Sequence, residues 1–97
     1  MRPREITQLK NAIRARHDCD ARYVITIPAN HLPSNQSGWD GRIAVFELIG
    51  HPSAERCYAW TVRKGHRNEF VTFLLLPPVD SPRAAVEMWN SQAGVAT

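Results

Sequence analysis

Residues 41–76 read GRIAVFELIGHPSAERCYAWTVRKGHRNEFVTFLLL, and this part of the chain sets the fold class. It contains three segments rich in β-branched, aliphatic and aromatic residues, which predict β-strands at 41–49, 56–63 and 69–76. Turn-forming residues separate these segments, with Gly50-His51-Pro52 in the first connection and Gly65 in the second. Because such short connections join antiparallel neighbours, we expect the three strands to form a meander.

A further strand and two helices extend this meander in both directions. Residues 22–27 (RYVITI) predict the additional strand, and residues 29–38 (ANHLPSNQSG) predict a loop after it. A helix is expected over residues 3–17, which begin with a proline and carry an apolar stripe at helical spacing. Ser81 and Pro82 predict the start of a second helix, which we expect to stop at Gly94.

The predicted order is therefore α-β-β-β-β-α. It defines an α+β fold in which a four-stranded antiparallel meander sheet is flanked by the N- and C-terminal helices. The chain has 97 residues, of which 43% are hydrophobic and 22% charged, so residues 1–97 are expected to form a single domain. This composition excludes a disordered, collagen-like or coiled-coil chain.

The predicted strands are apolar on both faces, whereas a sheet covered on one side alternates apolar and polar residues. In the strand 41–49, for example, Ala44 and Phe46 point to one face while Ile43 and Val45 point to the other. We expect both helices to pack on one face, because two small helices cannot cover both. The other face then meets a second copy or a ligand, or the sheet curls into a partial barrel. We therefore expect a homo-oligomer, in its simplest form a homodimer.

The location of the protein is expected to be cytoplasmic. The longest apolar run, residues 70–79, is half as long as a bilayer span and contains two prolines, so no membrane association is expected. No apolar stretch typical of an export signal follows the basic N-terminus.

Two cysteines, Cys19 and Cys57, are expected to be reduced, since they do not make a disulfide framework. The spacing of the histidines and cysteines matches no zinc motif, and the chain has no glycine-rich phosphate loop, so neither a metal nor another cofactor is expected. A small enzyme using Cys57 as nucleophile and His51 as base is one possible function. Against it, a thiol in the middle of a strand is usually buried and inert.

Aromatic residues with a few polar partners are typical of small-molecule pockets. If the domain binds a ligand, we expect the pocket to be lined by Trp39, His51, Tyr58 and Trp60. Ordinary core or turn packing is the competing interpretation of all four.

Nucleic-acid binding is another possible function, since the net charge is +3 and the sequence pI about 9.3. The most basic local run lies in the predicted hairpin tip and contributes Arg63, Lys64, His66 and Arg67. The first helix would add Lys10 and Arg14. The order of elements resembles that of double-stranded RNA-binding domains with one extra strand. That family has lysines at the start of its last helix, where this chain has Asp80.

Two segments resemble a family of short bacterial proteins to which no activity is assigned. One runs from Val45 through Gly50-His51-Pro52 to Arg56-Cys57-Tyr58-Ala59-Trp60, and the other is Pro77-Pro78-Val79-Asp80-Ser81-Pro82 with the residues that follow. The resemblance covers about half the chain. It implies a bacterial cytosolic origin and no particular reaction.

Taken together, these observations predict a small non-enzymatic binding or protein-interaction domain that self-associates. The alternatives are a nucleic-acid-binding accessory protein and the small enzyme described above.

Overall fold

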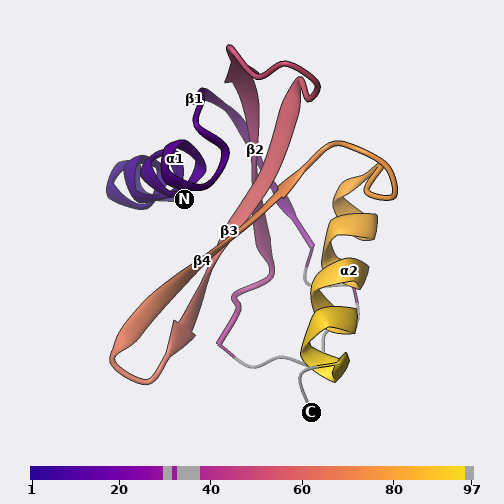
Figure 1. Cartoon of the computed structure of the whole chain (residues 1–97). Helices are drawn as coiled ribbons and strands as arrows, with labels where there is room; N and C mark the ends of the chain where they lie inside the picture. The colour runs from indigo at the N-terminus through magenta and orange to yellow at the C-terminus, as the bar shows by residue number, and fades with distance from the viewer. Residues whose placement is uncertain (30–31, 33–37, 96–97) are drawn as a thin grey trace.

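The computed structural model describes residues 1–29, 32 and 38–95, and the side chains of these as far as residue 92. Its elements follow the predicted α-β-β-β-β-α order, which confirms the α+β fold (Figure 1). They are α1 (Pro3–His17), β1 (Asp20–Pro28), β2 (Arg42–Ile49), β3 (Arg56–Lys64), β4 (Arg67–Leu74) and α2 (Pro82–Val95). The predicted loop 29–38 lies largely outside the described residues.

The strands form one antiparallel sheet in the order β1-β2-β3-β4, so β1 and β4 are its edges. β4 begins two residues earlier than the sequence predicts, because its ladder with β3 continues to the pair Lys64 and Arg67. Gly65 permits this tight connection, since its φ of 62° lies in the left-handed region that glycine adopts without strain.

Helix α1 covers one face of the sheet. Its buried residues Leu9 and Ile13 pack against a layer from β2 and β3 that consists of Ala44, Phe46, Cys57 and Ala59. Half-buried residues from α1, β1 and β4 surround this cluster, including Ile6, Tyr23 and Phe70. The stripe predicted from the spacing of residues 6, 9 and 13 is therefore the face that α1 buries.

Helix α2 covers the opposite face. Ala85, Val86 and Trp89 pack against the other side of β2 and β3, which presents Ile43, Val45, Tyr58, Trp60 and Val62. The Ser81 hydroxyl accepts a hydrogen bond from the Ala84 amide at 3.1 Å, as expected for an N-cap residue. Figure 1 shows the two helices on opposite sides of the strands.

The prediction that both helices share one face is therefore wrong. Each helix lies over one apolar layer, and the strands between them have buried residues on both sides, as in a central layer. The homodimer was predicted from an apolar sheet face without a covering helix. In the structure α1 covers one face and α2 covers the other. None of the described helices is long and apolar enough to cross a membrane.

The segment before β2 also packs against β3. The Gly38 carbonyl accepts a hydrogen bond from the Arg63 amide at 2.9 Å, and Trp39 forms an isolated bridge with Val62. This contact brings the start of β2 close to the β3–β4 hairpin, at the end of the sheet where the candidate site lies.

Candidate functional site

A polar cavity of about 540 Å³ lies on the α1 side of the molecule, at the end of the sheet near the β3–β4 hairpin. The beginning of α1, the beginning of β2 and the neighbouring parts of β3 and β4 form its walls. Its lining residues are Arg2, Arg4, Glu5, Gln8, Asp40, Arg42, Thr61 and Asn68. The volume is in the range of ligand pockets, but the wall is hydrophilic and contains three guanidinium groups, which suits an anionic ligand.

The first turn of α1 contributes the positive end of a helix to this cavity. No side chain caps the helix at Arg2, and Pro3 stands in the first turn. The backbone N–H groups of the turn that Arg4 and Glu5 occupy therefore have no intrahelical acceptor. Together with the guanidinium groups of Arg2 and Arg4, they favour negative charge in the cavity.

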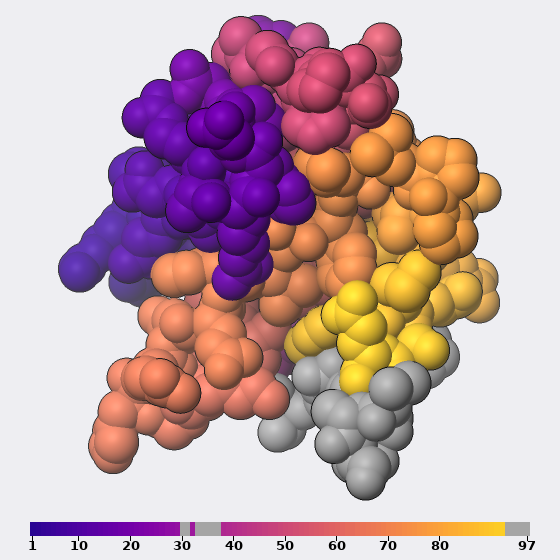
Figure 2. Space-filling view, viewed as in Figure 1, coloured from indigo at the N-terminus to yellow at the C-terminus, as the bar shows by residue number. Residues whose placement is uncertain are grey.

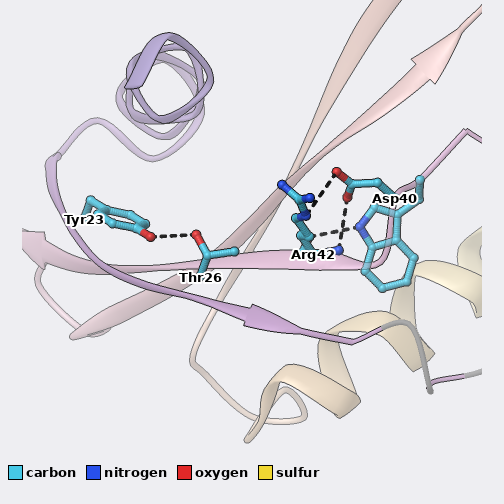
Figure 3. Close-up of polar contacts among 5 residues, drawn as sticks. Tyr23, Thr26, Asp40 and Arg42 are labelled. Atoms are coloured by element: carbon cyan, nitrogen blue, oxygen red, sulfur yellow. Dashed lines mark hydrogen bonds and ion pairs between the residues drawn. The ribbon is translucent and has the colours of Figure 1, made fainter. Parts of the chain in front are cut away.

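Arg42 is held at the cavity by its neighbours at the start of β2 (Figure 3). The Asp40 carboxylate accepts a hydrogen bond from the Arg42 backbone N–H at 3.1 Å, and its second oxygen lies 3.9 Å from Arg42 Nε. The Trp39 indole N–H donates to the Arg42 carbonyl at 3.0 Å. These contacts fix the backbone of residue 42, while its guanidinium group is only loosely paired with Asp40.

Thr61 contributes a hydroxyl group whose hydrogen-bonding capacity is unused. It lies on the same face of β3 as Cys57 and Ala59, beyond the part that α1 covers. Its Oγ1 is buried and has no hydrogen-bond partner within the described part of the chain. A buried hydroxyl without a partner is uncommon, and this one belongs to a residue of the cavity wall.

The β3–β4 hairpin adjoins the cavity through Asn68, which lines it and pairs with Arg63 across the two strands. The four basic residues predicted from the sequence, Arg63, Lys64, His66 and Arg67, are all exposed here. Figure 2 shows the hairpin as a lobe that projects from the molecule at the lower left, below α1. The structure thus brings the hairpin and the cavity arginines to one end of the sheet.

We call Arg2, Arg4, Arg42, Arg63, Lys64 and Arg67 the basic end. Its acidic neighbours are Glu5 and Asp40 in the cavity and Glu69 on β4. This end therefore carries the whole formal net charge of +3. The remaining six cations of the chain are balanced by six carboxylates, several of them in contact, as in the pairs Arg14 with Asp20 and Arg22 with Glu47.

Of the four residues predicted to line a ligand pocket, three lie together in the α2-side core and His51 lies apart from them. Trp60 and Tyr58 are buried in the α2-side core, and Trp39 packs on Trp60 with ring centroids 5.6 Å apart. His51 lies beyond the opposite end of β2, where its Nδ1 accepts hydrogen bonds from the backbone of Ser53 and Ala54. Three of the four are thus core packing residues, and His51 stabilises a turn.

The environment of Cys57 is unfavourable for nucleophilic catalysis. The thiol is fully buried under α1, and burial raises its pKa to about 12. It is therefore protonated at neutral pH, and protonated buried thiols are poor nucleophiles. His51 Nδ1 is occupied by two backbone amides, so the pair has neither the accessibility nor the protonation state that the enzyme alternative requires.

Arg2, Arg4, Arg42 and Thr61 line the cavity but are not among the site residues predicted from the sequence. Lys10 and Arg14 were predicted from the first helix instead, but Arg14 is paired with Asp20, which raises the pKa of Arg14. Arg2 and Arg4 stand far from Arg42 in the sequence, so no local pattern marks the three, and only the fold brings them beside the hairpin. Within the described residues, His, Cys, Asp and Glu do not form a group of three that is suited to a metal ion.

Comparison with known proteins gives no relative for this chain. No family model matches it, and neither the curated proteins nor the solved structures contain a significant match. The resemblance to short bacterial proteins therefore stays a prediction, as does the bacterial origin it implies.

Proposed function

We propose that this protein is a non-enzymatic nucleic-acid-binding domain that contacts phosphates with the basic end. The observation that carries the proposal is the arginine-lined cavity of about 540 Å³ beside a protruding basic hairpin. In the sequence the basic residues are scattered along the chain, which argues against a phosphate-contacting surface. Folding gathers half of them on one end of the molecule, which removes that objection.

The chemistry of the basic end suits a polyanion better than a single small anion. The six cations extend from the cavity over the hairpin, so they can contact several phosphates of one chain. The unpartnered Thr61 hydroxyl and the side-chain amides of Gln8 and Asn68 supply neutral donors of the kind that also bind phosphate oxygens.

The test is the salt dependence of binding to mixed-sequence DNA labelled with fluorescein, followed by fluorescence anisotropy. Six phosphate contacts predict a slope of log K against log salt of about −5, from about −0.9 per contact on duplex DNA. In the double variant Arg4→Gln/Arg42→Gln we expect the slope to become shallower by about 2. A flat salt response of the wild-type protein, or no binding at low salt, would overturn the proposal.

A matched control removes the same charge elsewhere. Arg56 and Arg83 are exposed, at the start of β3 and on α2, and neither belongs to the basic end. The double variant Arg56→Gln/Arg83→Gln should keep the wild-type slope to within about 0.5, since its cations are not expected to contact phosphates. Equal losses in both double variants would show that only net charge matters, which contradicts a defined contact surface.

Self-association has a different observation in its favour, and we propose it as a second, independent property. β1 is an edge strand with a bulge at Val24, and two neighbouring apolar residues, Val24 and Ile25, are 40% and 52% exposed. An antiparallel strand can pair with itself about a two-fold axis, which would cover both residues. The proposed dimer contact is therefore this edge and not the sheet face expected from the sequence.

Light scattering after size exclusion tests this second property. We expect twice the chain mass of 11.0 kDa for the wild-type protein and the chain mass itself for Ile25→Lys. Ile49→Lys is the control, because Ile49 is exposed at the end of β2 rather than on the outer edge. A wild-type protein that elutes as a monomer at micromolar concentration contradicts the proposal.

The cytoplasmic location also stays a prediction.

A further inference from the structure

We infer that the nucleic acid is double-helical DNA and that the β3–β4 hairpin enters its major groove while the cavity holds a backbone phosphate. This inference rests on the proposed function and adds the class of ligand. Its support is the shape of the hairpin, the position of the cavity relative to it, and the location of every aromatic side chain.

The hairpin has the dimensions and charge that a major groove requires. Its strands pair without interruption from Cys57 with Leu74 to Lys64 with Arg67. The segment before β2 contacts β3 as far as Arg63, so the two-stranded tip is the part from Lys64 to Arg67. The major groove of B-form DNA, about 12 Å wide, admits such a ribbon. Arg63 lies on the α1 face of this ribbon, and Lys64 and Arg67 lie on the other, so cations face both phosphate walls of the groove.

The cavity is placed to receive a phosphate from one of those walls. It opens on the α1 side of the same hairpin, next to Asn68. Its wall holds the three arginines Arg2, Arg4 and Arg42 against the two carboxylates Glu5 and Asp40. A phosphate oxygen in it would accept a hydrogen bond from the unpartnered Thr61 hydroxyl. The hairpin and the cavity are thus a groove contact and a backbone contact on adjacent surfaces, a combination that fixes the orientation of a duplex.

Single strands fit this surface less well. Proteins that bind single strands usually stack the bases on exposed aromatic side chains. The three Phe, three Trp and two Tyr of this chain all lie in the two cores of the sheet, and none lines the cavity. Trp39, the aromatic residue at the start of β2, packs on Trp60 and Trp89 and donates its N–H to the Arg42 carbonyl. Because no aromatic side chain is available at the basic end to stack on bases, its cations bind through contacts with phosphates.

Duplex RNA is disfavoured by its shape. The major groove of an A-form helix is deep and too narrow for side chains to reach, so the hairpin would lose its contacts there. The proposed order of affinity is therefore duplex DNA first, with single-stranded DNA and duplex RNA of the same sequence weaker.

The experiment compares these three probes, each labelled with fluorescein, by anisotropy at about 0.1 M salt. We expect duplex DNA to bind about ten-fold more tightly than the single strand, from the difference between about −0.9 and −0.7 in salt slope over six contacts. Equal or tighter binding of the single strand or of duplex RNA, still lost in Arg4→Gln/Arg42→Gln, overturns this inference and leaves the proposed function intact. Binding of none of the probes overturns both.

Two further measurements assign the groove. Methyl green, which occupies the major groove, should displace the protein from duplex DNA, whereas netropsin, which occupies the minor groove, should not. In Lys64→Gln/Arg67→Gln we expect duplex affinity to fall on the order of 50-fold at about 0.1 M salt, since two counterion-releasing contacts are lost. The control Arg56→Gln/Arg83→Gln should bind like the wild type. Displacement by netropsin alone, or full affinity in the hairpin variant, contradicts entry through the major groove.

Discussion

At the scale of single residues, the structure explains residue types and pairings that the linear sequence does not explain. Gly38 lies so close to β3 that an added Cβ would stand 2.1 Å from the Arg63 carbonyl oxygen. Glu47 pairs with Arg22, which lies opposite it on β1. The need for a partner is predictable from the chemistry, but the choice of partner depends on strand register.

Replacing Gly38 tests the close approach between the start of β2 and β3. Gly38 and Gly50 both have positive φ, 91° and 88°, but only Gly38 has an atom within 4 Å of the position of an added Cβ. An alanine at a positive φ costs about 1–2 kcal/mol of backbone strain, and both alanine variants carry this cost. We expect Gly38→Ala to lower the free energy of unfolding by at least about 2 kcal/mol more than Gly50→Ala, in urea titrations. Equal losses would mean that this segment does not pack on β3.

The buried thiol of Cys57 makes the free energy of unfolding depend on pH in the alkaline range. Burial raises its pKa from 9.0 to about 12, so above pH 9 the unfolded chain loses a proton that the folded protein keeps. The free energy of unfolding should therefore fall as pH rises from about 9 to about 12, by up to about 1.4 kcal/mol per pH unit. Tyr58, whose pKa burial also raises, acts in the same direction, so the measurement compares wild type with Cys57→Ala. A variant whose stability falls as steeply as that of the wild type contradicts this assignment.

At the scale of elements, the sequence predicted the order of the helices and strands, the antiparallel pairing of the strands and most of the element boundaries. Periodicity and turn residues are local signals, and these properties depend on local signals. The side of the sheet on which each helix packs depends on the path of the chain between elements, which amino-acid spacing does not encode. The observation that the strands are apolar on both faces was correct, and its explanation is one helix on each face.

The two cores should respond to substitution independently. Leu9 is buried in the α1-side core and Val86 in the α2-side core, with the sheet between them. Leu9→Ala should cost about 2–5 kcal/mol of unfolding free energy, and Val86→Ala somewhat less. In the double variant we expect the two losses to add to within about 0.5 kcal/mol, since the residues share no contacts. An interaction energy above about 1 kcal/mol would show that the cores are coupled through the sheet.

At the scale of the whole molecule, the candidate site is the part that the sequence predicted least well. The hairpin cations were identified, because they are consecutive, but Arg2, Arg4, Arg42 and Thr61 come from three separate segments that only the fold brings together. The aromatic residues mark the core rather than a ligand pocket, since both functions select the same residue types.

The concentration of positive charge at one end predicts stabilisation by anions. Phosphate bound in the cavity would raise the free energy of unfolding with ligand concentration, whereas chloride at equal ionic strength would only screen. We expect the midpoint of thermal unfolding to rise with added phosphate in the wild type and in Arg56→Gln/Arg83→Gln. In Arg4→Gln/Arg42→Gln the rise should be absent. The same rise in all three proteins would indicate a general salt effect and contradict a defined anion site.

The packing of α2 on its own face of the sheet has a consequence for synthesis on the ribosome. Helix α1 precedes the strands and can cover its side as they emerge, but α2 follows all four strands. Until it emerges, Trp60 and the residues around it have no cover, and the nascent chain presents an apolar surface to chaperones and to other unfinished chains. Translation that stalls before residue 82 would therefore leave a product prone to aggregation and quickly degraded.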